Sequence, residues 1–173
     1  MALQKTPLLT ETTNDLITKY LKDNFNLFLK EVDFQYQDGI SLEQIDDTSY
    51  HISDLIETLT LPCIYVLSGP HAFQYTENPN YLQSDDEIVV VLTAEEIGLD
   101  SLTRKVWRYG RVLFASLNLI DLGDSAGRIK LKTVPTRLAY TKPITSKLKK
   151  EEQRFRADVV LELKVLHYEN NLT

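Results

Sequence analysis

The sequence predicts an α+β fold, in which a mixed or antiparallel sheet carries amphipathic helices on one face and ends in a long C-terminal strand. Three stretches predict it. Residues 154–168 alternate between apolar and polar side chains, as a strand with one buried face does, and "EIVVVLTAE" at 87–95 is a continuous apolar run rich in β-branched residues. Between them, residues 101–119 place apolar side chains at helical spacing.

The final strand, "FRADVVLELKVLHYEN", is unusually long. Its apolar face is predicted to comprise Phe155, Ala157, Val159, Leu161, Leu163 and Val165. The stretch from Phe155 to Tyr168 would extend about 46 Å at roughly 3.3 Å per residue, whereas ordinary strands have about 5–6 residues. We expect its middle to pair within the subunit and one end to overhang, which would offer unpaired backbone to a neighbouring copy.

The helix over 101–119 is the strongest helical prediction, with Ser101 as its N-cap. Its expected buried face consists of Leu102, Val106, Tyr109, Leu113 and Leu117, and its expected basic face of Arg104, Arg108 and Arg111. The run at 87–94 precedes it. Because that run is apolar on both faces, we expect a central strand covered on each side.

The N-terminal half begins with a predicted amphipathic helix over about 13–30, capped by Thr12 or Thr13. After this helix, the sequence predicts a short strand in "VDFQYQ", which ends at the turn Asp38-Gly39, and then a loop over 40–60 with a short helix near 54–59. A strand is predicted in "PCIYVLSG", stopped by Ser68-Gly69-Pro70, and an irregular loop around Asn78-Pro79-Asn80.

The later segment "RIKLKTV" alternates again and is predicted to be a strand until Pro135, beyond which it becomes an edge or a loop. We interpret residues 1–173 as a single α+β domain. Within it, residues 31–84 form an acidic, irregular, insertion-like region, and residues 128–153 form a strand plus a basic loop.

The composition, with 43% hydrophobic and 25% charged residues, is that of an ordinary globular protein. No run approaches 18 apolar residues, so we expect no membrane span, and the first fifteen residues lack the apolar core of a secretory signal. The single Cys63 allows no intramolecular disulfide, which fits a reducing compartment.

Charge divides the chain into two parts. Fifteen acidic residues lie between Glu31 and Asp100, and no lysine or arginine follows Lys30 until Arg104. From Arg104 to the end there are fifteen basic and seven acidic residues. The chain is therefore an acidic half joined to a basic half.

No pattern in the chain predicts an enzyme. The three histidines lack metal-ligand spacing, and no glycine-rich phosphate loop or nucleophile elbow occurs. Cys63 and His71 could form a thiol–imidazole dyad across a hairpin, but a cysteine within an apolar strand more often acts as a small hydrophobe. Neighbouring carboxylates in Asp85-Asp86-Glu87 point to opposite faces of a strand and seldom share one ion. We therefore expect no catalytic, cofactor-binding or metal-binding residues.

The segment 128–150 carries eight lysines and arginines and no acidic residue. It could make the protein a nucleic-acid-binding module, but Tyr140 is its one aromatic residue, which leaves little for base stacking. Contact with an acidic protein surface is the favoured interpretation, and the acidic half of the chain is such a surface.

The order of elements resembles that of the tail terminator (tail-completion) proteins of tailed bacteriophages. The resemblance covers about half of the chain, from about Glu87 to Tyr168, and lies in four pieces: "EIVVVLTAEE", "SLTRKVWRYGRVLFASLNLI", "GRIKLKTV" and "RFRADVVLELKVLHYE". It rests on element order and pattern, since no short motif defines that family. The acidic region 32–84 has no counterpart in it.

The resemblance implies a virion structural protein of the phage neck, assembled in the host cytoplasm. Such proteins form rings, often hexamers, that cap the tail tube and join it to the head or connector; DNA can pass through the lumen. They carry no catalytic residues. Another neck ring subunit, such as a head-completion, connector or adaptor protein, is the alternative within this class.

The charge division agrees with ring formation, because complementary halves can associate head to tail and close into a ring. The hypothesis places the acidic surface of 31–100 against the basic surface of 104–156. Its candidate interface residues are Arg104, Arg108, Arg111, Lys130, Lys132 and Arg137 on the basic side and Asp46, Asp47, Asp85 and Asp86 on the acidic side.

Overall fold

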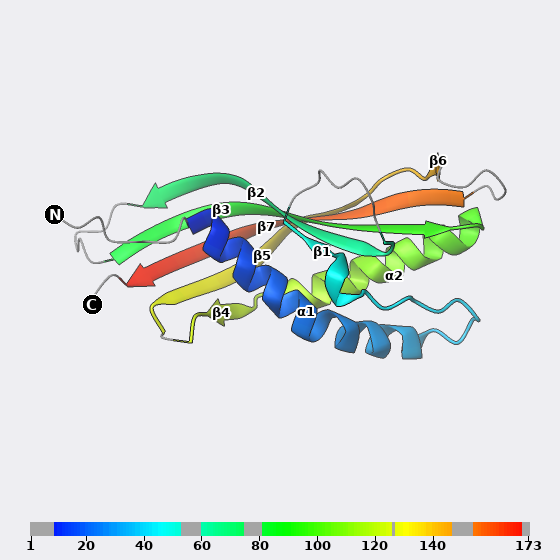
Figure 1. The fold of residues 1–173 in the computed structure, drawn as a ribbon, viewed down its shortest axis with the longest axis horizontal. Helices are drawn as coiled ribbons and strands as arrows, with labels where there is room; N and C mark the ends of the chain where they lie inside the picture. Colours follow the sequence, from blue (N-terminus) through cyan, green and yellow to red (C-terminus); the bar gives the residue numbers. More distant parts are fainter. Residues whose placement is uncertain (1–8, 53–59, 75–80, 126, 147–153, 171–173) are drawn as a thin grey trace.

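The computed structural model describes residues 9–52, 60–74, 81–125, 127–146 and 154–170, which form the predicted α+β fold (Figure 1). The elements in chain order are α1 (Leu9–Gln35), a 3₁₀ turn η1 (Asp47–Ser49), β1 (Tyr50–His51), β2 (Cys63–Gln74), β3 (Tyr81–Glu96), α2 (Leu99–Leu117), β4 (Asp121–Gly123), β5 (Ile129–Tyr140), β6 (Ile144–Ser146) and β7 (Arg154–Asn170). The short helix predicted near 54–59 and the loop around 78–80 lie outside the described residues.

The sheet is mixed and has seven strands in the part of the chain that the structure describes. Its order is β1-β2-β3-β7-β5-β4, with β6 also paired to β7. The pair β1–β2 is parallel, and the other pairs are antiparallel. The three strands predicted at 87–94, 128–134 and 154–168 are therefore confirmed as members of one sheet.

The long final strand is the centre of the sheet and does not overhang. β3 pairs with one side of β7 from Tyr81↔Asn170 to Glu96↔Phe155. On the other side, β5 pairs with residues 159–169 and β6 with residues 154–156. The expectation of an unpaired end is wrong in the described residues, because β3 is nearly as long as β7 and two strands share its other side. The length of β7 thus satisfies backbone groups within one subunit.

Two β-bulges bend the sheet at one level. The β2 bulge lies between Ser68 and His71, and the β5 bulge lies between Pro135 and Arg137. Ser68 pairs with Ile88, which pairs with Leu163, which pairs with Pro135, so the bulges flank the β3–β7 pair on both sides. Bulges increase local twist, and Figure 1 shows the long strands twisting sharply near mid-length.

The predicted ends of β2 and β5 both lie at these bulges. The prediction that β2 stops at Ser68-Gly69-Pro70 is wrong, because the bulge absorbs these residues and the strand continues to Gln74. Gly69 fits there because a Cβ would lie 3.0 Å from the backbone oxygen of Glu87. β5 passes Pro135 and continues to Tyr140, paired there with β7 on one side only, because β4 pairs with residues 130–132 alone. The prediction of an edge beyond Pro135 is therefore confirmed in the described residues.

Both helices cover the same face of the sheet and share one hydrophobic core with its inward-facing residues (Figure 1). The predicted α2 face is confirmed, since Leu102, Val106, Tyr109, Leu113 and Leu117 are all buried. The expectation that β3 is covered on both faces is not met by the described helices. Val89 and Val91 point to the opposite face and are only half-buried, between neighbouring strands.

The α1 helix is longer at both ends than predicted. It begins at Leu9, so Thr12 and Thr13 lie inside the helix and the expected N-cap is wrong. The predicted strand in "VDFQYQ" is wrong as well, because α1 continues through Gln35. Val32 extends the buried helical face of Phe25 and Leu29, and this packing overrides the local β propensity.

The α2 helix begins earlier than predicted, after Gly98 as N-cap, so Ser101 lies within its first turn and the expected cap is wrong. The N–H of Leu102 donates to the carbonyl of Gly98 at 2.9 Å. At the other end, the buried Thr133 hydroxyl on β5 donates to the carbonyl of Leu117 at 2.6 Å and accepts from the N–H of Ile120 at 3.1 Å. These contacts attach the end of α2 to the sheet.

Candidate assembly interface

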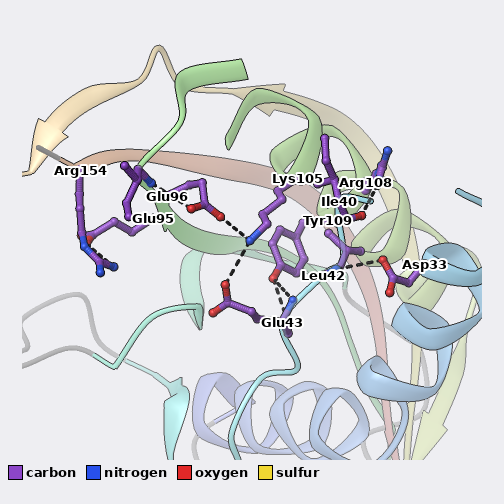
Figure 2. A network of polar contacts seen from close by, with 11 residues as sticks. Asp33, Ile40, Leu42, Glu43, Glu95, Glu96, Lys105, Arg108, Tyr109 and Arg154 are labelled. Atoms are coloured by element: carbon purple, nitrogen blue, oxygen red, sulfur yellow. Dashed lines mark hydrogen bonds and ion pairs between the residues drawn. The ribbon is translucent and has the colours of Figure 1, made fainter. Parts of the chain in front are cut away.

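The loop after α1, residues 36–46, lies against α2 and joins the acidic half of the chain to the basic half (Figure 2). Lys105 on α2 binds Glu43 of this loop at 3.1 Å and also binds Glu96 at the end of β3. Burial alone would lower the pKa of Lys105, but the hydrogen bonds to Glu96 and Glu43 outweigh it and raise that pKa. The ammonium therefore stays charged although Lys105 is largely buried.

Arg108 is the second contact between the loop and α2. Its guanidinium donates to the carboxylate of Asp38 and to the carbonyl of Ile40, and it stacks on the Tyr36 ring at 4.2 Å from the ring centroid. The hydrogen bond from Arg108 is the main cause that lowers the pKa of Asp38. The Arg108 side chain is only 5% exposed, so it belongs to the interior of the subunit rather than to a free basic face.

Ion pairs connect the two charged halves within one copy at several places. Each of the following joins an acidic residue of 31–100 to a basic residue of 104–173: Asp38–Arg108, Glu43–Lys105, Glu96–Lys105, Glu95–Arg154 and Asp85–Lys164. The sheet explains part of this, since β3 from the acidic half pairs antiparallel with β7 from the basic half. The charge division is therefore partly neutralised inside the subunit.

The candidate basic residues fall into three situations. Arg104 and Arg111 are exposed on α2, where Arg111 donates to the Tyr36 hydroxyl at 3.1 Å. Lys130 and Lys132 are exposed on the outer face of β5. Arg137 is exposed and binds Glu162 of the same copy at 3.0 Å.

Among the candidate acidic residues, Asp46 and Asp47 are exposed, and Asp46 caps η1 by accepting from the N–H of Thr48 at 2.9 Å. Asp85 is half-buried and binds Lys164 at 2.7 Å. Asp86 is fully buried, so the structure places it away from any surface that a second copy could reach.

Asp86 is the centre of a buried polar cluster below the N-terminal part of α1. His71 Nδ1 lies 2.8 Å from one carboxylate oxygen, to which the Ser84 hydroxyl also donates at 2.7 Å. His167 Nδ1 lies 3.6 Å from the other oxygen, to which the Thr13 hydroxyl donates at 3.3 Å. Burial raises the pKa of Asp86, but the hydrogen bonds from His167, His71 and Ser84 outweigh it and lower the pKa to about 2.

His71 contacts Asp86 and does not form the thiol–imidazole dyad with Cys63. Cys63 and His71 lie on the same strand, eight residues and so roughly 26 Å apart, and cannot touch. Cys63 pairs instead with Thr93 and is fully buried, where burial raises the pKa of its thiol. Asp85 and Asp86 point to opposite faces, as expected, and no group of three metal-ligating side chains occurs in the residues described.

The sequence patterns missed the apolar residues on the outer faces of the helices. Phe34 is 80% exposed, and Leu27 and Trp107 are each 58% exposed. Phe114 is 41% exposed. A signal was available, because Trp107 and Phe114 fall outside the predicted buried face of α2 at a spacing of seven residues.

Tyr140, the one aromatic residue of the basic segment, has a packing role. Its ring lies over Gly110 of α2, where an added Cβ would come within 2.6 Å of the Tyr140 hydroxyl. The glycine therefore permits β5 and α2 to approach closely.

No protein-family model matches the chain, and no curated protein matches it. One solved structure to which the chain shows similarity is a chain from "Virion of native gene transfer agent (GTA) particle". The identity is 16%, the TM-score is 0.33, and the match covers 84% of this chain and 94% of that chain. None of the helices described here is long and apolar enough to cross a membrane.

Proposed function

We propose that the protein is a structural subunit of a phage-like virion, and specifically a tail terminator that forms a closed ring on the tail tube and joins it to the head or connector. One observation carries the proposal. The four segments that resemble tail terminators lie together in the fold: β3, β7 and β5 are adjacent strands, and α2 packs on them. The resemblance therefore extends over a contiguous unit rather than scattered pieces.

The surface of the folded subunit is suited to assembly. Arg104, Arg111, Lys130 and Lys132 remain exposed after the internal ion pairs are formed, as do Asp46 and Asp47. The outer helix faces add exposed apolar side chains, Leu27 and Phe34 on α1 and Trp107 and Phe114 on α2, that contact with another copy would bury. Apolar contacts would supply most of the affinity, and charge would set register and rate.

The proposal assigns no catalytic role to any residue. The cluster around Asp86 is enclosed between α1 and the sheet, where it holds the helix in place. We expect Cys63→Ser and His71→Ala to leave the assembly function intact apart from modest changes in stability. Loss of function in either variant with the fold preserved would contradict this expectation.

The function is tested by imaging and localisation. Purified protein should form rings with a central hole in negative-stain images, with a single oligomer mass by native mass spectrometry. An antibody against the protein should label the junction of head and tail in phage particles and one end of isolated tail tubes. Labelling only on the head side would favour another neck ring subunit, and labelling elsewhere, or a protein that stays monomeric, would overturn the proposal.

A further inference from the structure

A groove of about 710 Å³ lies on the face of the sheet that the described helices leave uncovered (Figure 1). On β3 it is lined by Asp85, Glu87 and Val89, which alternate with residues buried beneath the helices and therefore point to the opposite face. Pro70 in the β2 bulge and Thr136 in the β5 bulge line its two sides. This outer groove thus lies where the two bulges bend the sheet.

The outer groove is acidic. Its lining holds the three carboxylates of Asp85, Glu87 and Glu162 and the ammonium of Lys164. Two of the carboxylates are paired within the subunit, because Asp85 binds Lys164 at 2.7 Å and Glu162 binds Arg137 at 3.0 Å. Glu87 is exposed and forms no ion pair with any described residue. After the internal pairs are counted, the groove therefore keeps the negative charge of Glu87.

The outward face of α2 carries a basic and aromatic stripe on the other side of the subunit. This α2 stripe consists of Arg104, Trp107, Arg111 and Phe114, all exposed. Residues three and four apart lie on one side of a helix, so the four side chains form one row, turned away from the buried face that packs on the sheet. Asp100 is the one acidic residue of α2, so arginines outnumber carboxylates along the row.

The two surfaces match in charge and in length. Asp38, which lies beside α2, is paired with Arg108 of the same copy and leaves the positive charge of the stripe unchanged. Trp107 and Phe114 are seven residues apart, or about 10.5 Å along the helix axis, and residues 85–89 of the groove extend about 13 Å along β3. An amphipathic helix is the element that ordinarily covers an open sheet face.

We propose that the α2 stripe of one copy docks in the outer groove of a second copy. The occupant is a second copy because one chain carries both surfaces, with opposite net charge and on opposite sides of the sheet. Each copy then uses its helix side towards one neighbour and its open sheet side towards another, so the contact is head to tail and closes into a ring where the rotation permits. The inference rests on the proposed ring and names the surfaces that form it.

The first test reverses the charge of each surface and then of both. Arg104→Glu with Arg111→Glu makes the α2 stripe acidic, and Glu87→Lys makes the outer groove basic without breaking an internal ion pair. Either change alone brings like charges together, and the concentration needed for half-assembly in sedimentation should rise roughly tenfold or more. The chain with all three substitutions opposes unlike charges again and should regain assembly. Asp23→Lys, exposed on α1, controls for net charge and should have no effect.

The second test uses Trp107, which is the single tryptophan of the chain, so its fluorescence reports the contact directly. It is 58% exposed in the subunit, and docking would bury it. Its emission maximum should shift to shorter wavelength as the concentration rises through the assembly range, and Glu87→Lys should remove this shift over the same range.

Trp107→Ser removes the largest apolar side chain of the stripe. It should weaken assembly while the circular dichroism of the monomer stays unchanged, because the side chain is largely exposed. Phe73→Ser is the matched control and should assemble like the wild type. Phe73 is 57% exposed and pairs with the buried Ser84, so its side chain lies on the side of the sheet away from the groove.

The outcomes separate this inference from the proposed function. Rings in the wild type, and equally in the arginine variant and in Glu87→Lys, would overturn the inference and leave the ring intact. A chain with all three substitutions that folds but does not assemble would also overturn the inference. Assembly blocked by Lys130→Glu with Lys132→Glu, but not by these variants, would overturn it in favour of the outer face of β5. An open filament that depends on both surfaces would support the contact and overturn the ring. A wild type that is monomeric at every concentration would overturn both.

Discussion

The Tyr109 hydroxyl forms two hydrogen bonds with the backbone of Glu43: it donates to the carbonyl and accepts from the N–H, each at 2.9 Å. Tyr109 lies on α2 and its ring is buried, and this burial is the main cause that raises the pKa of its hydroxyl. The Glu43 side chain then reaches Lys105 one helical turn away. One helix thereby fixes the backbone and the charge of a loop far away in the sequence.

We expect Tyr109→Phe to destabilise the protein by about 1–3 kcal/mol, because it leaves two backbone groups of Glu43 without their partner. The measurement is urea unfolding followed by circular dichroism. The exposed Tyr168 on β7 provides the control, and its replacement by phenylalanine should change the free energy of unfolding by less than about 0.5 kcal/mol. Equal effects of the two changes would show that the Glu43 contact adds no stability.

Arg108 should affect stability rather than assembly. Arg108→Ala removes a charged hydrogen-bond donor from Asp38 and from the carbonyl of Ile40, and we expect a loss of about 1.5–3 kcal/mol. Arg104→Ala, one turn earlier on the same helix and exposed, should change the stability of the monomer by less than about 0.5 kcal/mol. The same unfolding measurement compares them. A stable Arg108→Ala monomer would return Arg108 to the list of interface candidates.

Leu113→Ala tests the packing of α2 on the sheet. Leu113 is fully buried, so truncation should cost about 2–5 kcal/mol in the free energy of unfolding. Leu27→Ala on the outer face of α1 is the matched control and should leave the monomer within about 0.5 kcal/mol of wild type. Both are measured by urea unfolding at a concentration where the protein is monomeric. A small effect at Leu113 would mean that the site collapses around the missing side chain.

Periodicity predicted the parts of the fold in which one face is buried. Leu113 on α2 and Val159 on β7 both fall on the predicted buried faces, because a single covered face imposes its period on the sequence. Periodicity failed where pairing with a neighbouring strand determines the local structure. Ser68-Gly69-Pro70 carries the residues of a turn, yet the neighbouring β3 keeps the chain in the sheet through a bulge.

The candidate interface was less predictable than the fold. Charge alone does not distinguish Arg104 from Arg108, although one is exposed and the other is enclosed by Asp38 and Tyr36. That difference depends on where a loop 70 residues earlier in the sequence lies. Sequence reasoning placed opposite charges in contact between copies, whereas the structure forms several of these contacts within one copy.

Acid should weaken the protein partly through Asp86. The pKa of this buried carboxyl is about 2 in the folded protein, below its ordinary value of 3.8. A lowered pKa stabilises the folded state above pH 4, and this contribution, about 2 kcal/mol, is lost as the pH falls from about 4 towards 2. Urea unfolding between pH 2 and pH 7 should show a smaller loss over this interval for Asp86→Asn than for wild type. Parallel profiles would show that Asp86 titrates normally.

Salt should slow the assembly of the proposed ring without reducing its final extent. The exposed arginines Arg104 and Arg111 would guide a second copy into register, and exposed charges act over about 10 Å at 0.1 M salt but only about 3 Å at 1 M. Exposed ion pairs are worth roughly 0–1 kcal/mol each, so screening them changes the encounter rate more than the equilibrium. Apolar contacts of Trp107 and Phe34 are not screened, and Trp107→Ser should therefore lower the final extent at every salt concentration.

Light scattering gives the initial rate and native mass spectrometry the final extent, from 0.05 to 1 M sodium chloride. A rate that does not change with salt, in a protein that still forms rings, would mean that the contact between copies is apolar alone.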